Sequence, residues 1–211
     1  MRIVIIGASY GIGAELAKQA RAAGHHVVAV ARSMTSEPAS DLIPIKGSII
    51  DPGVAECAVD GAEAVAWCLG VKTLGPAALR MVTVFSEGTR RTIEAMNAAG
   101  VSRLVVITGI GAGESRGHGG FLYDWIGLPL IAGAIYADKD RQEAIVMASG
   151  LDWTIIRPTL LTNGPRTGSY RVLTDLTGVH GGRISRGDCA DCLMRAIAEH
   201  AWSRKAVLIT N

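Results

Sequence analysis

The sequence predicts an α/β fold: a doubly wound, mostly parallel sheet in a single domain that spans residues 1–211. Apolar, β-branched runs alternate with helical patterns along the whole chain, which is the order of right-handed β-α-β crossovers. The 211 residues fit one core, and no repeat, linker or low-complexity segment divides them. The composition is 49% hydrophobic but only 5% aromatic and includes 26 glycines, which suits an aliphatic sheet joined by tight turns.

The first half of the chain contains two successive strand-helix-strand patterns. The elements expected there are, in order, a strand over 2–6, a helix over 11–23, strands over 26–31 and 42–46, a short helix from Pro52 and a strand over 64–68. Gly24 stands where the end of the first helix needs a left-handed residue. This half therefore supplies the parallel strands around the first crossover.

The second half continues the alternation. Pro76 is expected to open a long helix that ends before Gly100, and Asp188 to cap a helix that reaches about His200. The remaining expected elements are strands over 103–108, 152–156 and 206–209 and a helix over 136–149, with irregular structure over 109–120. The last strand closes the predicted sheet.

Charge and segment composition exclude several classes of partner. The formal net charge is +2, and the 21 basic and 19 acidic side chains are spread along the chain, so nucleic acid is not expected to bind. No signal peptide precedes the first strand, which predicts a cytoplasmic protein. The apolar segment 121–137 is too short, and too broken by Asp124, Gly127 and Pro129, to span a membrane.

The four cysteines are interpreted as reduced and mostly buried thiols. Cys57 and Cys68 are isolated, whereas Cys189 and Cys192 form a C-x-x-C pair on an expected amphipathic helix. That pair lacks the second pair, or the nearby histidine, that would complete a metal site. No metal is therefore predicted.

A glycine-rich turn follows the first expected strand. It reads Gly7-Ala8-Ser9-Tyr10-Gly11-Ile12-Gly13 and opens the first helix. The backbone N–H groups and positive dipole end of a helix bind a pyrophosphate when no Cβ blocks the approach. Directly after the first strand, this turn predicts a Rossmann-type dinucleotide site. The alternative is that the glycines serve only close packing of strand and helix.

The end of the second expected strand bears on the choice of dinucleotide. Rossmann proteins that bind NAD usually place an acid there, which accepts a hydrogen bond from the ribose 2′-hydroxyl. This chain has Arg32 and Ser33 instead. A guanidinium can bind a 2′-phosphate with two hydrogen bonds, so NADP(H) is predicted in preference to NAD(H). Arg32 as a solvated surface charge is the alternative.

With these motifs, the chain resembles the atypical short-chain dehydrogenase/reductase family with NmrA-like members, over nearly its whole length. Within that family it is similar to the members that reduce biliverdin and flavins. The residues that carry the resemblance, besides the glycine turn and Arg32, are Trp153-Thr154-Ile155-Ile156-Arg157-Pro158, Ser86-Glu87-Gly88, Ala95-Met96, Gly100-Val101 and Pro165-Arg166-Thr167-Gly168-Ser169-Tyr170. The family includes reductases, epimerases and catalytically silent sensors.

The resemblance implies a set of cofactor contacts. Beyond the turn and the Arg32-Ser33 pair, they are Ser48 and Ile49 beside the adenine, Leu69 and Gly70 after the fourth strand, and Thr108, Pro158 and Thr159 at the nicotinamide. Two positions depart from the family pattern. Ser48 stands where relatives often have an aspartate, and Tyr10 stands where many atypical members have glycine.

The catalytic residues of alcohol-oxidising relatives are incomplete in this chain. Those relatives use a serine after the fifth strand and a Tyr-x-x-x-Lys helix, in which the lysine lowers the pKa of the tyrosine. Gly109 stands at the serine position, and Tyr136-Ala137-Asp138-Lys139 is one residue short. Tyr136 is a candidate acid, with packing or a lid as the alternative. Lys139 is a candidate for binding cofactor ribose or phosphate, with a solvated charge as the alternative.

Without a complete acid, hydride transfer is easiest to an acceptor that stabilises its own negative charge, such as a flavin or quinone. The segment 121–137 could cover a small planar, conjugated substrate, or it could form the interface of a homodimer. His118 is interpreted as a mobile loop residue, Trp153 as core, and Arg157 as an anchor for the loop through carbonyls or a carboxylate.

Three functions follow from these residues. The first is an NADPH-dependent reductase of a flavin, quinone or similar acceptor that has no essential protein acid. The second is a sensor of the NmrA type that binds NADP(H) without turnover. The third is an enzyme like the sugar-nucleotide epimerases, for which 211 residues leave little room for a substrate domain.

Overall fold

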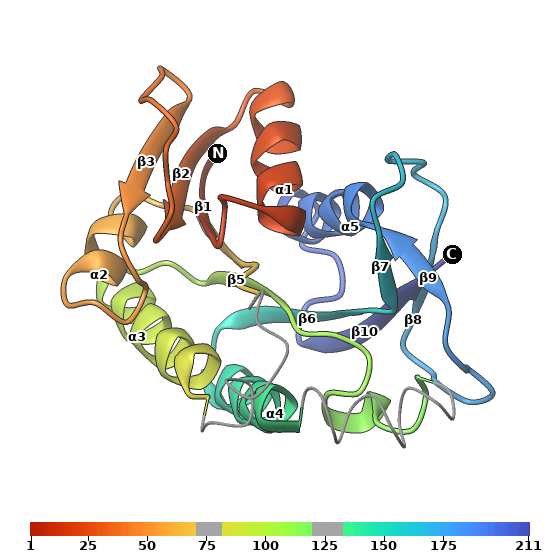
Figure 1. Cartoon of the computed structure of the whole chain (residues 1–211). Coiled ribbons are helices and arrows are strands. Elements are labelled where there is room, and N and C mark those ends of the chain that lie inside the picture. The colour runs from red at the N-terminus through yellow and green to blue at the C-terminus, as the bar shows by residue number, and fades with distance from the viewer. Residues whose placement is uncertain (71–81, 120–132) are drawn as a thin grey trace.

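The computed structural model describes residues 1–70, 82–119 and 133–211. Eight strands form one sheet in the order β3-β2-β1-β4-β5-β6-β10-β8, and a second, two-stranded sheet pairs β7 with β9 (Figure 1). The strands of the large sheet are β1 Arg2–Ile6, β2 His26–Ala31, β3 Leu42–Lys46, β4 Ala64–Trp67, β5 Arg103–Ile107, β6 Asp152–Pro158, β8 Arg171–Leu173 and β10 Lys205–Thr210. All neighbours pair in parallel except β10 and β8. The predicted doubly wound, Rossmann-type fold is confirmed.

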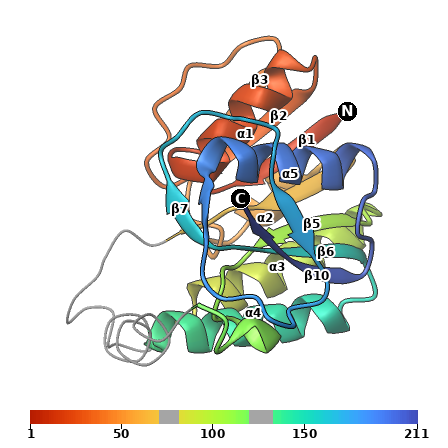
Figure 2. The same cartoon turned by 90° about the vertical axis from the view of Figure 1, so that its right-hand side faces the viewer.

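Helices cover both faces of this sheet. They are α1 Gly11–Ala22, α2 Val54–Val59, α3 Val84–Ala99, α4 Gly133–Ala148 and α5 Arg186–Ala198. Helices α1 and α5 pack together on one face, and α3 and α4 pack together on the other (Figure 2). The order of strands reverses between β1 and β4, which places the crevice at the carboxyl ends of the strands.

The core consists of two apolar layers that the strands separate. Alternate residues of a strand point to opposite faces, and β1 shows this directly. Ile3 and Ile5 belong to the cluster under α1 and α5, whereas Val4 and Ile6 belong to the cluster under α2, α3 and α4. All four are at most 1% exposed, so β1 is central and fully buried.

The start of α3 differs from the prediction. A helix that runs unbroken from Pro76 is wrong, because Val82 and Thr83 are not helical and α3 begins at Val84. The backbone N–H groups of Phe85 and Ser86 donate to Oδ2 of Asp138, a side chain from α4. A carboxylate that is distant in sequence therefore caps this helix, and no local motif indicates it.

The cap of α5 also differs. Ser185, not Asp188, precedes the helix, and its Oγ accepts the backbone N–H of Asp188 at 2.9 Å. The side chain of Asp188 accepts the N–H groups of Thr167 and Gly168 instead. Asp188 therefore fixes the 163–170 loop, and the predicted cap is wrong by three residues.

Three short strands were not predicted: β7 Leu160–Thr162, β8 Arg171–Leu173 and β9 Arg183–Ser185. Strand β6 runs on to Pro158, and α4 begins at Gly133, three residues before its predicted start. A 3-10 turn, Gly113–Ser115, interrupts the expected irregular stretch. Most of the apolar segment 121–137 lies outside the described residues.

Candidate functional site

The glycine turn brings backbone atoms closer than any side chain would allow. Gly7 has φ +89°, and a Cβ on it would lie 2.8 Å from Cα of Leu69. A Cβ on Gly13 would lie 2.3 Å from the carbonyl oxygen of Gly7. Glycines that pack strand to helix and leave the turn bare are what a pyrophosphate-binding turn requires. Close packing, the alternative for these glycines, is therefore what the structure shows at Gly7 and Gly13.

The backbone N–H groups of the turn divide into two sets. Those of Gly7 and Ala8 donate to the carbonyl of Val30, at 2.8 and 3.2 Å, so these two residues shape the turn. Helix α1 begins after Tyr10 with no side-chain cap and no acidic residue in its first turn. An anion is thus the complement of the N–H groups and dipole at this end, around Gly11, Ile12 and Gly13.

Arg32 and Ser33 lie beside the turn at the carboxyl end of β2. Oγ of Ser33 lies 3.1 Å from Oγ of Ser9, which ties the two segments together. Arg32 is exposed, and among the described residues its guanidinium forms no ion pair. Both residues therefore follow the strand end at which Rossmann proteins contact the adenosine ribose.

A cavity of about 220 Å³ joins this edge of the sheet to the next strands. Six of the residues predicted to contact the cofactor line it: Gly7, Arg32, Ser48, Ile49, Leu69 and Gly70. Ile50 and Val84, which the sequence did not indicate, also line it. Relatives often have an aspartate at the position of Ser48. Here the backbone N–H of Ser48 donates to Oδ2 of Asp51 at 2.8 Å, so a carboxylate lies three residues after that position.

These features fit a dinucleotide. A Cβ on Gly11 would meet only the side chain of Arg186, at 3.8 Å, so the turn is open there. The first turn of α1 has no side-chain cap, and the apolar cleft beside the turn is lined by Arg32. The remaining predicted contacts lie at the ends of β5 and β6, on the same edge of the sheet.

A second cavity of about 580 Å³ lies at those strand ends. It brings together Thr108, Tyr136, Lys139, Pro158 and Thr159, all of which were predicted from the sequence. Further lining residues come from β7, β9 and the first residue of α5. The candidate acid and the predicted nicotinamide contacts therefore share one cavity.

Tyr136 and Lys139 converge at Gly109 in spite of their shortened spacing. A Cβ on Gly109 would lie 3.0 Å from Oη of Tyr136 and 3.6 Å from Nζ of Lys139. Nζ also lies 5.1 Å from the centre of the Tyr136 ring. Residues three apart on a helix share a face, so Tyr136 and Lys139 approach each other although their spacing is one residue shorter than in a Tyr-x-x-x-Lys helix. Gly109, at φ +149°, occupies the point where relatives place a serine.

Lys139 is held inside the site rather than solvated. Its Nζ donates to the carbonyl of Thr108 at 2.5 Å. Burial lowers the pKa of this ammonium to about 8, although the nearby Glu143 carboxylate partly offsets the effect. Asp138 is buried and Lys139 is part-buried, whereas Arg141, at the other end of this run of charges, is exposed. Lys139 is therefore not a fully solvated charge.

A buried ion pair supports the floor of this cavity. Arg157 donates from Nη2 to Oε2 of Glu143 at 2.7 Å and from Nε to Oε1 at 3.1 Å, and both residues are 2% exposed. Oγ1 of Thr108 donates to the same carboxylate at 2.6 Å. The predicted anchoring role of Arg157 is confirmed, and Glu143 is a residue that sequence reasoning missed.

The side chain of the loop histidine, His118, contacts the segment before β9. Nδ1 of His118 lies 3.0 Å from the carbonyl oxygen of Val179, and its ring stacks on that of His180 with centroids 6.4 Å apart. His118 does not line the second cavity. Its position ties the 113–119 loop to the segment before β9.

The cysteines and Trp153 are mainly structural. Cys68, Cys189 and Cys192 are buried and Cys57 is exposed, all as free thiols. Burial raises the pKa of the Cys68 and Cys192 thiols to about 12, which makes them poor nucleophiles at neutral pH. Among the described residues, no three His, Cys, Asp or Glu side chains are placed to hold a metal. Trp153 packs, partly buried, against the core as predicted.

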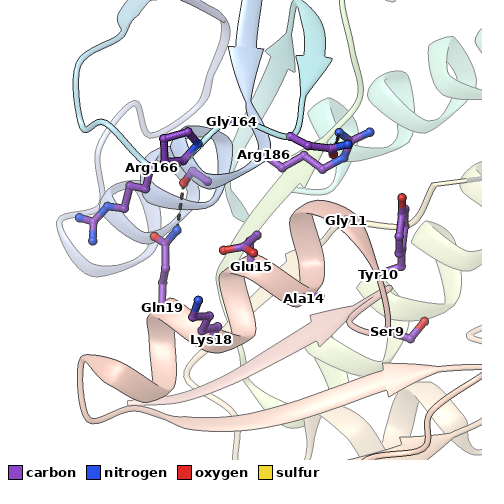
Figure 3. Close-up of a pocket in the computed structure, with 13 residues that line it drawn as sticks. Ser9, Tyr10, Gly11, Ala14, Glu15, Lys18, Gln19, Gly164, Arg166 and Arg186 are labelled. Carbon is purple, nitrogen blue, oxygen red and sulfur yellow. Dashed lines mark hydrogen bonds between the residues drawn. The ribbon is translucent and has the colours of Figure 1, made fainter.

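A third cavity, of about 640 Å³, lies between α1 and the 163–166 segment (Figure 3). Ser9, Tyr10 and Gly11 line one end of it, and Arg186 lines both this cavity and the second one. Arg186 therefore stands between the glycine turn and the substrate side of the site. The sequence did not indicate this arginine.

In the part of the chain that is described, no helix is both long and apolar enough to cross a membrane.

Comparison with known proteins agrees with this geometry. The chain is 32% identical, over 125 residues, to the uncharacterized sugar epimerase YhfK of Bacillus subtilis, covering 59% of this chain and about half (52%) of that relative. A short-chain dehydrogenase/reductase of Veillonella parvula, solved in complex with NADP, has a TM-score of 0.80 at 18% identity and covers 100% of this chain and 94% of its own. The anaerobillin reductase ChuY of Escherichia coli O157:H7 has a TM-score of 0.76 at 21% identity, covering 100% and 97%.

The two solved structures share the fold over the full length, as the resemblance to atypical short-chain dehydrogenases/reductases implied. A family model described as NAD(P)H-binding matches residues 7–200, from the glycine turn to the end of α5. The chain therefore belongs to this NAD(P)H-binding family.

Proposed function

We propose that the protein is an NADPH-dependent oxidoreductase that reduces a flavin, a quinone or a similar conjugated acceptor. The observation that carries this proposal is the second cavity, which continues the line of the dinucleotide cradle along the carboxyl ends of β5 and β6. When bound, a reduced nicotinamide supplies a hydride. The residues of the chain supply the alignment of the two rings, which alone can contribute several kcal/mol to catalysis.

The preference for NADPH rests on the carboxyl end of β2. A guanidinium and two hydroxyls, from Arg32, Ser33 and Ser9, are gathered there, whereas the acid that NAD-specific proteins use is missing. A phosphate accepts hydrogen bonds from all three groups. The NADP complex of the Veillonella parvula protein, which has the same fold, supports this choice.

Tyr136 and Lys139 have supporting roles in this proposal. The phenol hydroxyl can donate a hydrogen bond into the cavity, and the ammonium, when protonated, favours negative charge that develops there. A flavin or quinone spreads that charge over its own rings, and solvent can deliver the proton. We therefore propose that the reaction has no essential protein acid.

The experiment that tests the proposal measures NADPH oxidation at 340 nm with FMN and with menadione, and NADPH binding alone by calorimetry. Turnover with either acceptor, together with binding, is the expected result. Tight binding with no turnover of any acceptor would favour the second candidate, a sensor of the NmrA type, which the missing serine at Gly109 supports.

A redox-neutral enzyme is the third candidate, and the Bacillus subtilis relative, which is named a sugar epimerase, supports it. An epimerase would interconvert nucleotide sugars without net use of NADPH. Incubation with UDP-glucose and UDP-galactose, followed by chromatography of the sugars, separates this activity from a reductase.

A further inference from the structure

Helix α4 uses polar side chains on two of its faces. Its buried residues are Ile135, Asp138, Gln142, Glu143 and Val146, so three of the five are polar. Residues three and four apart on a helix lie on one face. Asp138, Arg141 and Gln142 form one such face, which contacts α3. Tyr136 and Lys139 share another face, which lines the second cavity. Polar contacts therefore help to fix the rotation of α4 about its own axis.

Asp138 makes the central contact with α3. Its Oδ2 accepts the backbone N–H groups of Phe85 and Ser86, at 2.9 and 3.3 Å, and its Oδ1 accepts the Ser86 hydroxyl at 2.5 Å. Nη2 of Arg141 lies 3.1 Å from Oδ1, and the same guanidinium donates to the carbonyl of Val82 at 2.8 Å. Asp138 is 0% exposed, so these donors replace the water that an ionised carboxylate needs.

The start of α3 is itself fixed in place. A Cβ on Gly88 would lie 2.7 Å from Cγ2 of Ile49 and 3.2 Å from Cζ2 of Trp67, so the helix lies directly on these side chains. The buried ring of Phe85 lies 6.0 Å from that of Trp67, centroid to centroid. Val84 and Ile49 line the cavity of about 220 Å³ beside the glycine turn. Asp138 thus ties α4 to a helix that borders the cofactor cleft.

The amine of Lys139 lies among groups that this contact brings together. Adjacent residues of a helix are about 100° apart around its axis, so a fixed Asp138 also fixes the direction of Lys139. Nζ of Lys139 lies 5.7 Å from the centre of the Phe85 ring and 5.1 Å from that of Tyr136. A cation within about 6 Å of an aromatic ring is attracted to its face. Phe85, whose N–H binds Asp138, therefore also contacts the amine of the next residue.

Charged groups lie near this amine on several elements. They are Asp138, Asp140, Arg141 and Glu143 on α4, Arg157 on β6, and Arg183 and Arg186 in the lining of the second cavity. Glu143 is paired with Arg157, and Asp138 with Arg141. Among the described residues Lys139 itself forms no ion pair. Its place therefore depends on how α4 is held and not on a salt bridge of its own.

We propose that Asp138 is a positioning residue of the site: by tying α4 to the first turn of α3, it holds Tyr136 and Lys139 against Gly109. The inference rests on the proposed function for the role of this pair and adds the residue that places it. A carboxylate suits the position because it accepts several hydrogen bonds at once. When it is removed, α4 can turn, and the amine moves from the carbonyl of Thr108 toward water.

The test measures where Lys139 titrates in the cofactor-free protein. The chain contains five lysines, so ¹³C-lysine labelling gives few Cε signals, and the signal that is lost in Lys139→Arg is that of Lys139. Burial lowers the pKa of this amine to about 8, so an amine that moves into water titrates at higher pH. Loss of a nearby negative charge alone lowers the pKa of an amine. The direction of the shift therefore separates an effect on position from an effect of charge.

Asp138→Ala removes every hydrogen bond from the side chain to α3. We expect the midpoint of the Lys139 titration to rise by about one pH unit or more. The dissociation constant of NADPH should rise with it. Asp138→Asn removes the charge but keeps an oxygen for the two N–H groups and an amide that can donate to the Ser86 oxygen. We expect it to restore the wild-type midpoint, or a slightly lower one.

The matched control is Asp140→Ala. Asp140 follows Lys139 directly, but its carboxylate accepts from the N–H of Gly113 and from Arg116, and so contacts the loop after β5 instead of α3. Its removal takes away an equal charge at the same sequence distance from the amine, and the midpoint should not rise. An unchanged or lowered midpoint in Asp138→Ala would overturn the inference, and so would an equal rise in Asp140→Ala.

Ser86→Ala decides the question if circular dichroism shows that Asp138→Ala is unfolded. This variant removes one of the three hydrogen bonds between Asp138 and α3 and leaves the two backbone N–H groups in place. Alanine is also a good helix former, so the fold should be retained. A smaller rise of the Lys139 midpoint supports the inference, and no rise refutes it.

Failure of this inference is separable from failure of the proposed function, because the titration needs neither cofactor nor turnover. If Lys139 responds as expected and no acceptor is reduced, Asp138 positions the pair but the protein is not a reductase of these acceptors. If acceptors are reduced and Asp138→Ala leaves the titration of Lys139 unchanged, the protein is a reductase and the inference is overturned.

Discussion

Arg157 of β6 and Glu143 of α4 form a two-point ion pair that lies under the loop after β5. A Cβ on Gly113 would lie 2.6 Å from both Nη2 of Arg157 and Oε2 of Glu143, so the loop rests directly on the pair. Through Oγ1 of Thr108, the same carboxylate also fixes the end of β5. One buried pair thus connects three segments that border the second cavity.

We predict that Arg157→Met destabilises the protein by about 3–5 kcal/mol, because it leaves the buried charge of Glu143 without a partner. Arg157→Met/Glu143→Gln removes that charge and keeps an acceptor for Thr108, so it should recover a large part of the loss. Urea unfolding of the three proteins measures both effects. A double variant no more stable than the single one would show that packing, rather than charge, dominates.

The glycine turn leads to a second prediction. Gly13→Ala places a Cβ 2.3 Å from the carbonyl oxygen of Gly7 and must displace the turn. We expect the dissociation constant of NADPH to rise at least tenfold and the melting temperature to fall, although alanine gains about 1 kcal/mol in helix propensity. Gly164→Ala is the control, because a Cβ there would lie at ordinary van der Waals distances, 3.6 and 3.7 Å, from its two nearest side-chain atoms. A higher melting temperature in Gly13→Ala would contradict the crowding argument.

Local sequence signals were enough for seven of the eight strands of the large sheet and for the glycine turn. The glycine turn, the Arg32 strand end and the strands from β1 to β5 are all encoded within short windows of apolar period and turn residues. The positive φ values of Gly24 and Gly100, +80° and +71°, follow the same local logic, since each follows the last turn of a helix.

The parts that could not be predicted depend on contacts between distant segments. Asp138 caps α3 across 53 residues, and Glu143 meets Thr108 across 35. Arg183 and Arg186 reach the cavity only because β9 pairs with β7, a strand of three residues with no periodic signal. The sequence alone does not show that these two arginines and Lys139 line one cavity, because only the fold brings them together.

Arg32 leads to a third prediction, which concerns cofactor choice. Arg32→Ala should raise the dissociation constant of NADPH about 10- to 100-fold and change that of NADH less than twofold, because only NADPH has the 2′-phosphate. NADH is the matched control in the same protein. Calorimetric titration of both cofactors checks it, and equal losses would refute the assignment of the phosphate to this arginine.

Tyr136 leads to a fourth prediction. If solvent protonates the reduced acceptor, Tyr136→Phe should lower kcat with FMN less than about fivefold, because the ring is kept and only the hydroxyl is removed. An essential acid contributes roughly 10²- to 10⁴-fold, so a loss in that range would identify Tyr136 as a catalytic acid. Stopped-flow measurement of the hydride-transfer step separates this effect from slow product release.

The fifth prediction concerns Lys139, whose pKa is lowered to about 8 by burial. Below pH 8 its ammonium is charged and can bind a cofactor hydroxyl or phosphate oxygen, and as pH rises through 8 the charge is lost. We therefore expect the dissociation constant of NADPH to rise between pH 7.5 and 9, by about threefold or more. The phosphate itself is already ionised there, since its second pKa is about 6.

Two variants test this assignment, with NADPH fluorescence as the readout from pH 7 to 9.5. In Lys139→Arg the rise should disappear, because a guanidinium stays protonated over this range. Lys139→Met should bind weakly at every pH, with no inflection. An inflection near pH 8 that persists in Lys139→Met would assign the titration to another group and remove Lys139 from the cofactor site, whereas its loss in both variants ties the pH dependence to the amine that lies beside Gly109.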